Sequence, residues 1–441
     1  MGETPDALAL RRRGHILDAE QSCHLRRAPQ ECARFCPVPF FIGHGSIVDR
    51  PYRRVQKYRS LIPGEGARLR SLTRGRNDQD VGGRVAEGEL DRPVGKSACG
   101  RRLGVRGWPA MMPLTEIDRL KQTVSEAWDS PVADQVAARW GYPAGTARWW
   151  RSSASHVFVL PDSGRRRYLR FVPGSYRGPK PVAVVAELMA RLSDGGSAVV
   201  RPVAAESGAL TVTVATGLGA MHAMVVEPAP GEEVDVTGLT ESQAWHWGQA
   251  LAHLHRDAAG LDTGLPESFG ELPGIGELFA DDTALVEATA RLTDVMRDLP
   301  RGRDRWGVVH GDFELDNMAW EDGRPIAYDF DEAALSWYAA DVAFAVRDLT
   351  DHTGRPTTEH RAQFDAFLAG YRGVRPFDDE DLGHLPLFAG LHAAVSLVRI
   401  TRALDAPARV EPDWLTELRD DLTDLARTHR QLVIEVGQEV G

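Results

Sequence analysis

Three oxygen-bearing side chains in one short stretch have the types and spacing that phosphoryl transfer requires. Asp312 lies in the loop His310-Gly-Asp-Phe-Glu-Leu-Asp-Asn317, and Asp329 opens the later segment Asp-Phe-Asp331. Mg²⁺ prefers oxygen ligands and usually keeps waters and substrate phosphates, so an amide and a carboxylate suffice as protein ligands. An acceptor hydroxyl needs a carboxylate that orients it and takes its proton. The pattern predicts Asp312 as the catalytic residue and Asn317 with Asp329 as metal ligands.

A β-hairpin is expected to position these side chains. Met318-Ala-Trp320 and Pro325-Ile-Ala-Tyr328 have strand-like composition and flank a Glu321-Asp-Gly323 turn. A hairpin that starts after Asn317 and ends at Asp329 brings both oxygen side chains to one point. A single His-x-Asp-x4-Asn occurs by chance, in which case its Asp and Asn only cap loops. The second acidic strand end makes the pattern more specific.

This stretch resembles the aminoglycoside phosphotransferase and choline kinase-like superfamily, whose members share the protein-kinase fold. Glu314-Leu-Asp-Asn317 and Trp337-Tyr-Ala-Ala-Asp341 further resemble its RdoA-like and type II homoserine kinase branch, and the resemblance covers residues 145–375. It implies an enzyme that uses ATP and Mg²⁺, with Asp312 as the base. It also implies that Asp341 anchors the loop, that Asp331 assists the metal, and that His310 is structural.

The resemblance also implies a nucleotide-covering loop and a basic phosphate contact. The loop would be Ser152-Ser-Ala-Ser155, with Ser153 near its centre, although the segment lacks a G-x-G-x-x-G pattern and is equally an ordinary strand turn. Arg170 stands where the family has a basic residue paired with a helical glutamate, here Glu187. An arginine fork can hold phosphate and carboxylate together, but a surface ion pair is the alternative.

The segment Val225-Val-Glu-Pro-Ala-Pro-Gly231 resembles the hinge between two lobes. By this resemblance the carbonyl of Glu227 and the N–H of Ala229 would meet the adenine base. Ala229 keeps its amide hydrogen between two prolines that have none.

The order of the expected elements, strands first and then mostly helices, indicates an α+β fold in two lobes. The resemblance implies that this is the bilobal protein-kinase-like fold, with a small antiparallel sheet in the N-lobe and a helical C-lobe. Short strand-like runs, including Ala198–Val200, precede Gly231, with one helix among them at Val182–Leu192. Later, Thr240-Glu-Ser-Gln243 predicts a helix start, and helices are expected at 281–299, 358–372, 383–404 and 411–433. We therefore place the N-lobe at 112–230 and the C-lobe, with the acceptor pocket, at 231–441.

The first 110 residues differ in charge from the rest of the chain. They hold 21 Lys and Arg against 12 Asp and Glu, which leaves 31 basic and 51 acidic residues in 111–441. We expect 1–111 to be a basic extension, either disordered or placed upstream of a true start at Met111 or Met112. The acidic body argues against a nucleic-acid partner, because binding phosphates needs clustered Lys and Arg.

The four cysteines all lie in this first segment. Cys23, His24, Cys32 and Cys36 could hold zinc, but their spacing matches none of the tight pairings that structural zinc sites use. No apolar run is long enough to span a membrane, and no secretory signal precedes the first helix. We expect a cytoplasmic enzyme with no membrane partner.

These residues do not determine the identity of the phosphate acceptor. A small-molecule hydroxyl, such as that of an aminoglycoside or an amino alcohol, is the first candidate class, and a protein Ser/Thr hydroxyl is the second. A catalytically silent nucleotide-binding module would be expected to lack Asp312, Asn317 or Asp329, and all three are present. A metal-dependent hydrolase would need further His/Asp pairs, which the sequence lacks.

Overall fold

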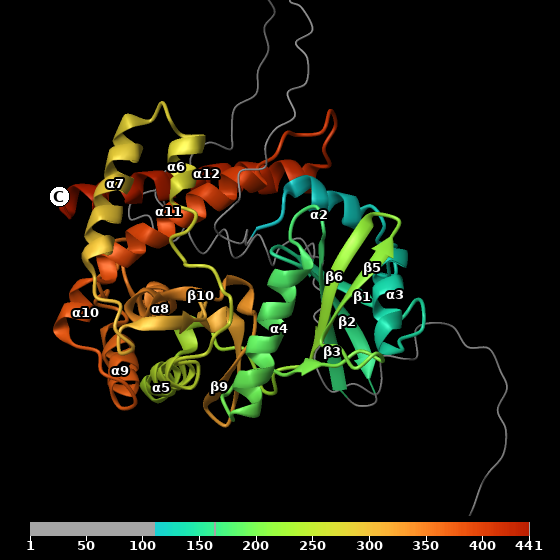
Figure 1. Ribbon diagram of the computed structural model, residues 1–441, viewed down its shortest axis with the longest axis horizontal. Coiled ribbons are helices and arrows are strands. Elements are labelled where there is room, and N and C mark those ends of the chain that lie inside the picture. Colours follow the sequence, from blue (N-terminus) through green and yellow to red (C-terminus); the bar gives the residue numbers. More distant parts are fainter. Residues whose placement is uncertain (1–110, 163–164, 441) are drawn as a thin grey trace, which may run out of the picture. The chain divides into compact units, whose positions relative to one another are not determined.

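The computed structural model describes residues 111–162 and 165–440. The zinc-ligand candidates Cys23, His24, Cys32 and Cys36, and residues 1–110 of the expected extension, lie outside the described residues. The predicted α+β class is confirmed: two short helices come first along the described chain, an antiparallel sheet with one inserted helix follows, and mostly helices come after it (Figure 1). Within the described residues, no helix combines the length and apolarity needed to cross a bilayer.

The sheet of the first half is antiparallel throughout. Its path is β1-β2-β3-β6-β4, and β5 pairs with β6. The strands are β1 (Arg148–Ser152), β2 (His156–Asp162), β3 (Arg165–Pro173), β4 (Pro202–Val203), β5 (Thr211–Thr216) and β6 (Gly219–Val226). The strand expected at Ala198–Val200 does not form, and Val199 makes only an isolated bridge to Ala327.

Side chains along β3 and β6 point alternately to the two faces of the sheet, and this divides the core into two layers. Leu169, Phe171 and Val225 pack in a cluster that includes helix α3 (Pro131–Ala137). Val172, Met224 and Val226 pack in a second cluster that includes helix α4 (Pro179–Asp194) and much of the second half of the chain. Because successive strand residues point to opposite faces, the sheet is covered on both sides. Figure 1 shows α4 and α3 on opposite faces.

The second half of the chain is built from α5 (Glu241–Asp257), α6 (Pro273–Leu278), α7 (Thr283–Asp298), α8 (Tyr338–Ala345), α9 (Arg361–Arg372), α10 (Asp379–Gly383), α11 (Leu385–Ala403) and α12 (Asp413–Glu439). The predicted start of α5 is confirmed, because Thr240 and Gln243 form a reciprocal capping box. Helices α5 and α9 cross closely. A Cβ on Gly248 would lie 1.9 Å from a backbone oxygen of α9, so only glycine permits this crossing.

Two small antiparallel strand pairs carry the loop 310–317 and the segment Asp329–Asp331. Strand β7 (Trp306–Val309) pairs with β10 (Ala334–Trp337), and β8 (Met318–Glu321) pairs with β9 (Arg324–Ala327). The predicted hairpin is confirmed, with Met318 opposite Ala327. The hydrogen bond from Tyr328 N to Asn317 O, at 2.9 Å, closes its open end.

Helix α2 (Leu114–Lys121) lies beside α12, far from it in sequence (Figure 1). Leu114 and Ile117 pack with Leu415 and Leu422 of α12 in one buried cluster. Thr115 N also donates to a carboxylate oxygen of Asp405 at 3.4 Å. The segment that precedes the sheet is therefore held against the last helix.

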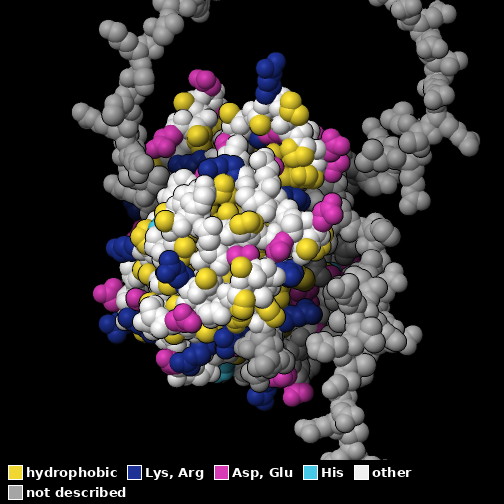
Figure 2. Space-filling model, turned by 90° about the vertical axis from the view of Figure 1, so that its right-hand side faces the viewer, with side chains coloured by type: hydrophobic (Ala, Val, Ile, Leu, Met, Phe, Trp, Pro, Cys, Tyr) yellow, Lys and Arg dark blue, Asp and Glu magenta, His cyan; other side chains and the backbone are white. Residues whose placement is uncertain are grey.

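One surface view shows how charge is distributed on the sheet side of the molecule. Figure 2 shows Lys and Arg side chains interspersed with Asp and Glu side chains over this face.

Candidate functional site

The catalytic loop begins where β7 ends. Gly311 takes φ +78°, and a Cβ at this position would lie 2.4 Å from the carbonyl oxygen of Glu332. The glycine therefore lets the loop turn tightly against the segment that follows Asp331. Asn317 Nδ2 donates to the backbone oxygen of Asp312 at 2.9 Å and to its carboxylate Oδ2 at 2.6 Å. These two bonds fix the orientation of both side chains.

Asp341 fixes the backbone of the loop that begins at His310. Its carboxylate accepts from the backbone N–H groups of His310 and Gly311, both at 2.8 Å, and lies 2.9 Å from His255 Nε2. Burial raises the pKa of Asp341, but the hydrogen bonds from His255 and His310 outweigh it and lower the pKa below its usual value. Asp341 is thus a buried carboxylate that organises the loop backbone, in line with the expected anchoring role.

His310 is fully occupied by structural contacts. Its Nε2 lies 3.2 Å from the carbonyl of Tyr328, and its Nδ1 accepts from the backbone N–H of Asp312 at 3.2 Å. The ring packs between Phe313 and Phe330. Burial lowers its pKa, so the ring is neutral near pH 7. Both ring nitrogens therefore have protein partners.

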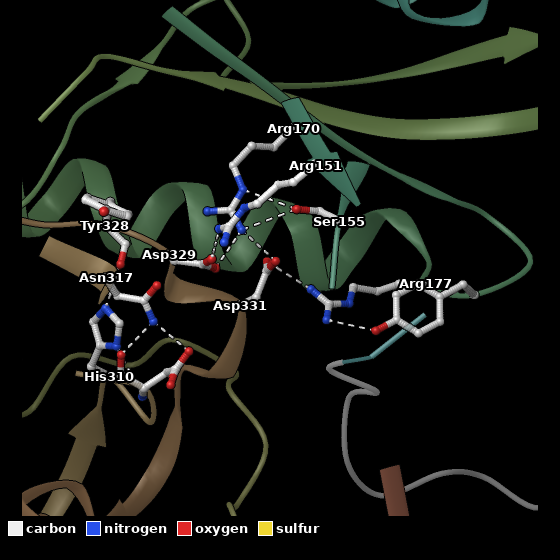
Figure 3. A network of polar contacts seen from close by, with 11 residues as sticks. Arg151, Ser155, Arg170, Arg177, His310, Asn317, Tyr328, Asp329 and Asp331 are labelled. Carbon is white, nitrogen blue, oxygen red and sulfur yellow. Dashed lines mark hydrogen bonds and ion pairs between the residues drawn. The ribbon is translucent and has the colours of Figure 1, made fainter. Parts of the chain in front are cut away.

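The two predicted metal ligands lie at the open end of the hairpin (Figure 3). The amide oxygen of Asn317 is buried and has no hydrogen-bond partner in the structure, since its Nδ2 already faces Asp312. Asp329 adopts φ +68°, one of three described non-glycine residues with positive φ. Buried oxygen acceptors rarely remain unpaired, and strained backbone is frequent at functional sites. An amide oxygen and a carboxylate fit a hard cation such as Mg²⁺.

No group of three or more His, Cys, Asp or Glu among the described residues could hold a metal ion. A cation at Asn317 and Asp329 would therefore take its remaining ligands from water and nucleotide phosphates, the usual coordination of Mg²⁺.

Arg170 is the centre of a buried ion-pair network (Figure 3). Its Nη2 lies 2.7 Å from Asp329 Oδ1 and 2.6 Å from Asp331 Oδ2. Ser155 Oγ accepts from the same guanidinium at 3.3 Å. Arg170 thus joins the sheet to the metal-ligand segment.

The expected pairing of Arg170 with Glu187 does not occur in the structure, where the partners of Arg170 are Asp329 and Asp331. Glu187 is exposed on α4, whose buried residues Val182, Val185 and Met189 face the core. At 3.6 residues per turn, Glu187 lies on the opposite side of the helix from that apolar stripe. The helix periodicity visible in the sequence already placed this glutamate outward.

Two further arginines, which the sequence analysis did not single out, complete the network. Arg151 Nη2 lies 2.6 Å from Asp329 Oδ2, and the buried Arg177 contributes Nη1 at 3.1 Å from Asp331 Oδ1. Arg151 directly precedes the Ser152–Ser155 loop, so a basic residue beside a candidate phosphate loop was the available signal. Arg177 had no such signal.

Arg347 was also missed and lies beside Asp312, the expected base. Its Nη1 is 3.6 Å from Asp312 Oδ1, and it also pairs with the buried Glu314. It comes from the 3-10 turn Val346–Leu349, which follows α8. Only the tertiary structure brings this turn to the loop.

The Ser152–Ser155 loop connects β1 to β2 and faces the catalytic loop across a cavity. Ser153 N donates to Ser155 O at 3.1 Å, and Ser153 O accepts from Met112 N at 3.2 Å. The backbone N–H of Ser153 is therefore engaged within the turn. Ser153 and Ala154 nonetheless line the same cavity as Asp312 and Asp329.

The hinge segment follows β6. Glu227 N donates to Arg201 O at 2.8 Å, and its carboxylate lies 3.3 Å from Arg167 Nε. Among the described residues, no hydrogen bond uses the Glu227 carbonyl or the Ala229 amide. Both backbone groups thus keep the hydrogen-bonding capacity that contacts with a base would use.

A cavity of about 220 Å³ runs from the catalytic residues into the helical half. Asp312, Asp329 and Asp331 line one end. Residues of α2, α11 and α12 line the other. Ser268 and residues of α11 such as Leu391, both within the predicted C-lobe, also line the cavity.

Comparisons with known proteins agree with this architecture. The model of the phosphotransferase enzyme family matches residues 146–377. Amicoumacin kinase of Bacillus subtilis is 21% identical over 251 residues, 55% of this chain and 75% of that protein. A homoserine kinase of Gluconacetobacter diazotrophicus is 30% identical over 255 residues, 53% of this chain and 75% of that protein.

Among solved structures, an amicoumacin kinase in complex with AMP-PNP, Ca²⁺ and Ami has a TM-score of 0.60 and 20% identity. The match covers 72% of this chain and 96% of that structure. The protein-kinase-like fold that the sequence indicated is thereby confirmed, as is the resemblance on which it rested. Because the family model matches residues 146–377 and the fold agrees with it, the chain belongs to the phosphotransferase enzyme family.

Proposed function

We propose that this phosphotransferase moves the γ-phosphoryl group of ATP, with Mg²⁺, to a hydroxyl of a small molecule. One observation carries the proposal. Asn317 is bonded to the Asp312 carboxylate through its Nδ2, while its buried amide oxygen remains without a partner beside the Asp329 segment. This arrangement supplies a base and two metal-compatible oxygens within one hairpin.

Each residue has a defined task. Asp312 would orient the acceptor hydroxyl and take its proton, in a loop whose backbone Asp341 holds rigid. Asn317 and Asp329 would hold Mg²⁺, which neutralises charge on the transferring phosphates. Arg170 and Arg151, now paired with Asp329, are placed to exchange part of that pairing for phosphate oxygens.

The nucleotide would lie between the Ser152–Ser155 loop and the hinge. The loop lines the cavity next to Asp312 and Asp329, which is the position that phosphates require. The Glu227 carbonyl and the Ala229 amide would hydrogen-bond the adenine edge.

The lining of the cavity favours a small molecule over a protein Ser/Thr acceptor. Besides the catalytic-loop residues, its lining comes largely from apolar side chains of helices α2, α11 and α12. A peptide segment would have to thread its backbone polar groups through apolar walls, which costs free energy.

Phosphate transfer from radiolabelled ATP, with and without Mg²⁺, tests the proposal. A panel of aminoglycosides, homoserine, choline, amino alcohols and sugars would be screened, with a protein acceptor as a separate arm. We expect Mg²⁺-dependent labelling of at least one small hydroxyl compound, lost in Asp312→Asn. Binding of ATP with no transfer to any acceptor would indicate a catalytically silent module instead.

A further inference from the structure

We propose that the acceptor joins its reacting hydroxyl to an apolar body, and that this body binds between α2, α11 and α12. This inference rests on the proposed function and deepens it, because it names the substrate class of the same site. The acceptor hydroxyl belongs beside Asp312, and the walls beyond that point determine what else the molecule must carry.

Those walls are mainly hydrocarbon. On the side away from the catalytic loop, the cavity is lined by Leu114, Ile117, Leu391, Val395, Leu418 and Leu422. Five of these six side chains are buried and Leu418 is half-buried. An acceptor with an alkyl or aryl body would leave water for this apolar lining on binding, which is the dominant favourable contribution to binding of apolar groups. A small polar acceptor such as homoserine would gain little of it.

The cavity continues past the catalytic site. A second cavity of about 430 Å³ shares Phe344, His392, Ser396 and His429 with the first, so these residues stand at the junction of the two. Burial lowers the pKa of His392 to about 3 and that of His429 to about 4, so both rings are neutral near pH 7. The junction therefore adds no charge that would repel an apolar body.

The polar groups gather at the opposite end. Glu332 and Arg399 line the cavity, pair with each other and lie close to the catalytic loop, and burial raises the pKa of Glu332. Arg399 is also held by the buried Glu271 at 2.7 Å. The site thus has a polar region beside the reacting hydroxyl and a hydrocarbon region beyond it, which matches an amphipathic acceptor.

The hydrocarbon walls lie outside the part of the chain that matches the family. The family match ends at residue 377, whereas α11 and α12 begin at Leu385 and Asp413, and α2 precedes residue 146. Segment 111–121 also touches the nucleotide side, since Met112 N donates to Ser153 O at 3.2 Å. The family model thus leaves these walls unspecified, and acceptor selection in this site lies with α2, α11 and α12.

A series of amino alcohols with a constant head and a growing body tests the inference. Ethanolamine, alaninol, leucinol and phenylalaninol each carry one primary hydroxyl and one amine. We expect kcat/KM to rise along the series by about fourfold for each methylene equivalent that leaves water. Homoserine serves as the polar comparison.

Variants on one helix provide the matched control. Leu418 lines the cavity and is half-buried on α12, whereas Ile434 is half-buried on the same helix and lines neither cavity. Leu418→Ala should lower the ratio of phenylalaninol to ethanolamine kcat/KM by about tenfold, and Ile434→Ala should leave that ratio within twofold. Ser396→Phe, which fills the junction, should lower it further.

Suppose that kcat/KM stays constant or falls along the series while ethanolamine or homoserine is phosphorylated well. That result would overturn the inference of an apolar body and leave the proposed function intact. Calorimetric binding covers the case in which no compound is phosphorylated. In that case, phenylalaninol that binds at least tenfold more tightly than ethanolamine, and no longer does so in Ser396→Phe, would support the apolar body even though the proposed function fails. Equal binding of the two compounds would overturn the inference.

Discussion

Asn317 Nδ2 donates to the carboxylate Oδ2 of Asp312 at 2.6 Å, and to the backbone oxygen of the same residue at 2.9 Å. The amide thus directs its nitrogen to Asp312 and its unpaired oxygen away from it. One side chain therefore links the expected base to the expected metal site, so a substitution of Asn317 should affect both.

Replacing Asp312 by Asn should abolish transfer while ATP still binds. The amide keeps the size of the side chain but cannot take a proton, and positioned bases contribute about 10²–10⁴-fold to rate. Steady-state kinetics and ATP titration measure the two properties. Asp316→Asn, at an exposed position in the same loop, is the control and should remain active. Full activity of Asp312→Asn would remove Asp312 from the mechanism.

Replacing Asn317 by Ala should raise the Mg²⁺ concentration that gives half-maximal activity by about tenfold or more, because one oxygen ligand is lost. The Asp312 carboxylate also loses its donor, so kcat should fall as well. Kinetics at a series of Mg²⁺ concentrations separate the two effects. An unchanged Mg²⁺ requirement would place the metal elsewhere.

Arg170 and Glu187 should respond differently to substitution. Arg170→Met leaves Asp329 and Asp331 without their shared buried partner, so we expect a loss of stability of about 3–5 kcal/mol and a higher KM for ATP. Glu187 is exposed and unpaired with Arg170, so Glu187→Gln should change neither. Chemical denaturation and ATP kinetics check both. A matching rise in KM for Glu187→Gln would mean that the pair forms once nucleotide binds.

Gly231→Ala should destabilise the hinge. Gly231 takes φ +95°, and a Cβ would lie 2.0 Å from the backbone oxygen of Trp320. We expect a loss of roughly 3 kcal/mol or more in unfolding free energy and weaker ATP binding, because the hinge must move from β8. Gly238→Ala, at a position with open space, is the control for thermal unfolding. Equal melting temperatures for the two variants would contradict this account.

Stability should fall as the pH drops below neutrality, because several histidines are buried. Burial lowers the pKa of His156 from 6.5 to about 3. Between those values the unfolded chain binds the proton and the native state does not. The unfolding free energy therefore decreases as the pH falls, by about 1.4 kcal/mol per pH unit for each such histidine.

Urea denaturation between pH 4 and 6.5 measures that slope. His156→Gln should reduce it by the contribution of one histidine, whatever the variant does to the absolute stability. His352→Gln changes an exposed side chain and should leave the slope as it was. An unaltered slope in His156→Gln would show that this ring is protonated in the native state.

Sequence alone could predict the features that local geometry determines. Asp312, Asn317 and Asp329 are tied by a short loop and one tight hairpin, so their spacing nearly dictates their arrangement. The start of α5 was equally local, since Thr240 and Gln243 satisfy each other within one turn. The outward position of Glu187 also follows from helix periodicity in the sequence, which contradicts the Arg170–Glu187 pair that the family resemblance implied.

Tertiary structure alone decided which charges meet and what the cavity accepts. Arg170 is 159 residues from Asp329, and Thr115 is 290 residues from Asp405. An arginine has many acidic residues within reach of a folded chain, and packing of the sheet against the helical half selects its partner. The cavity walls arise in the same way, because α2 reaches α12 only when both bury their apolar faces together. Local spacing carries the catalytic chemistry, whereas burial of distant apolar faces determines the partners and the pocket.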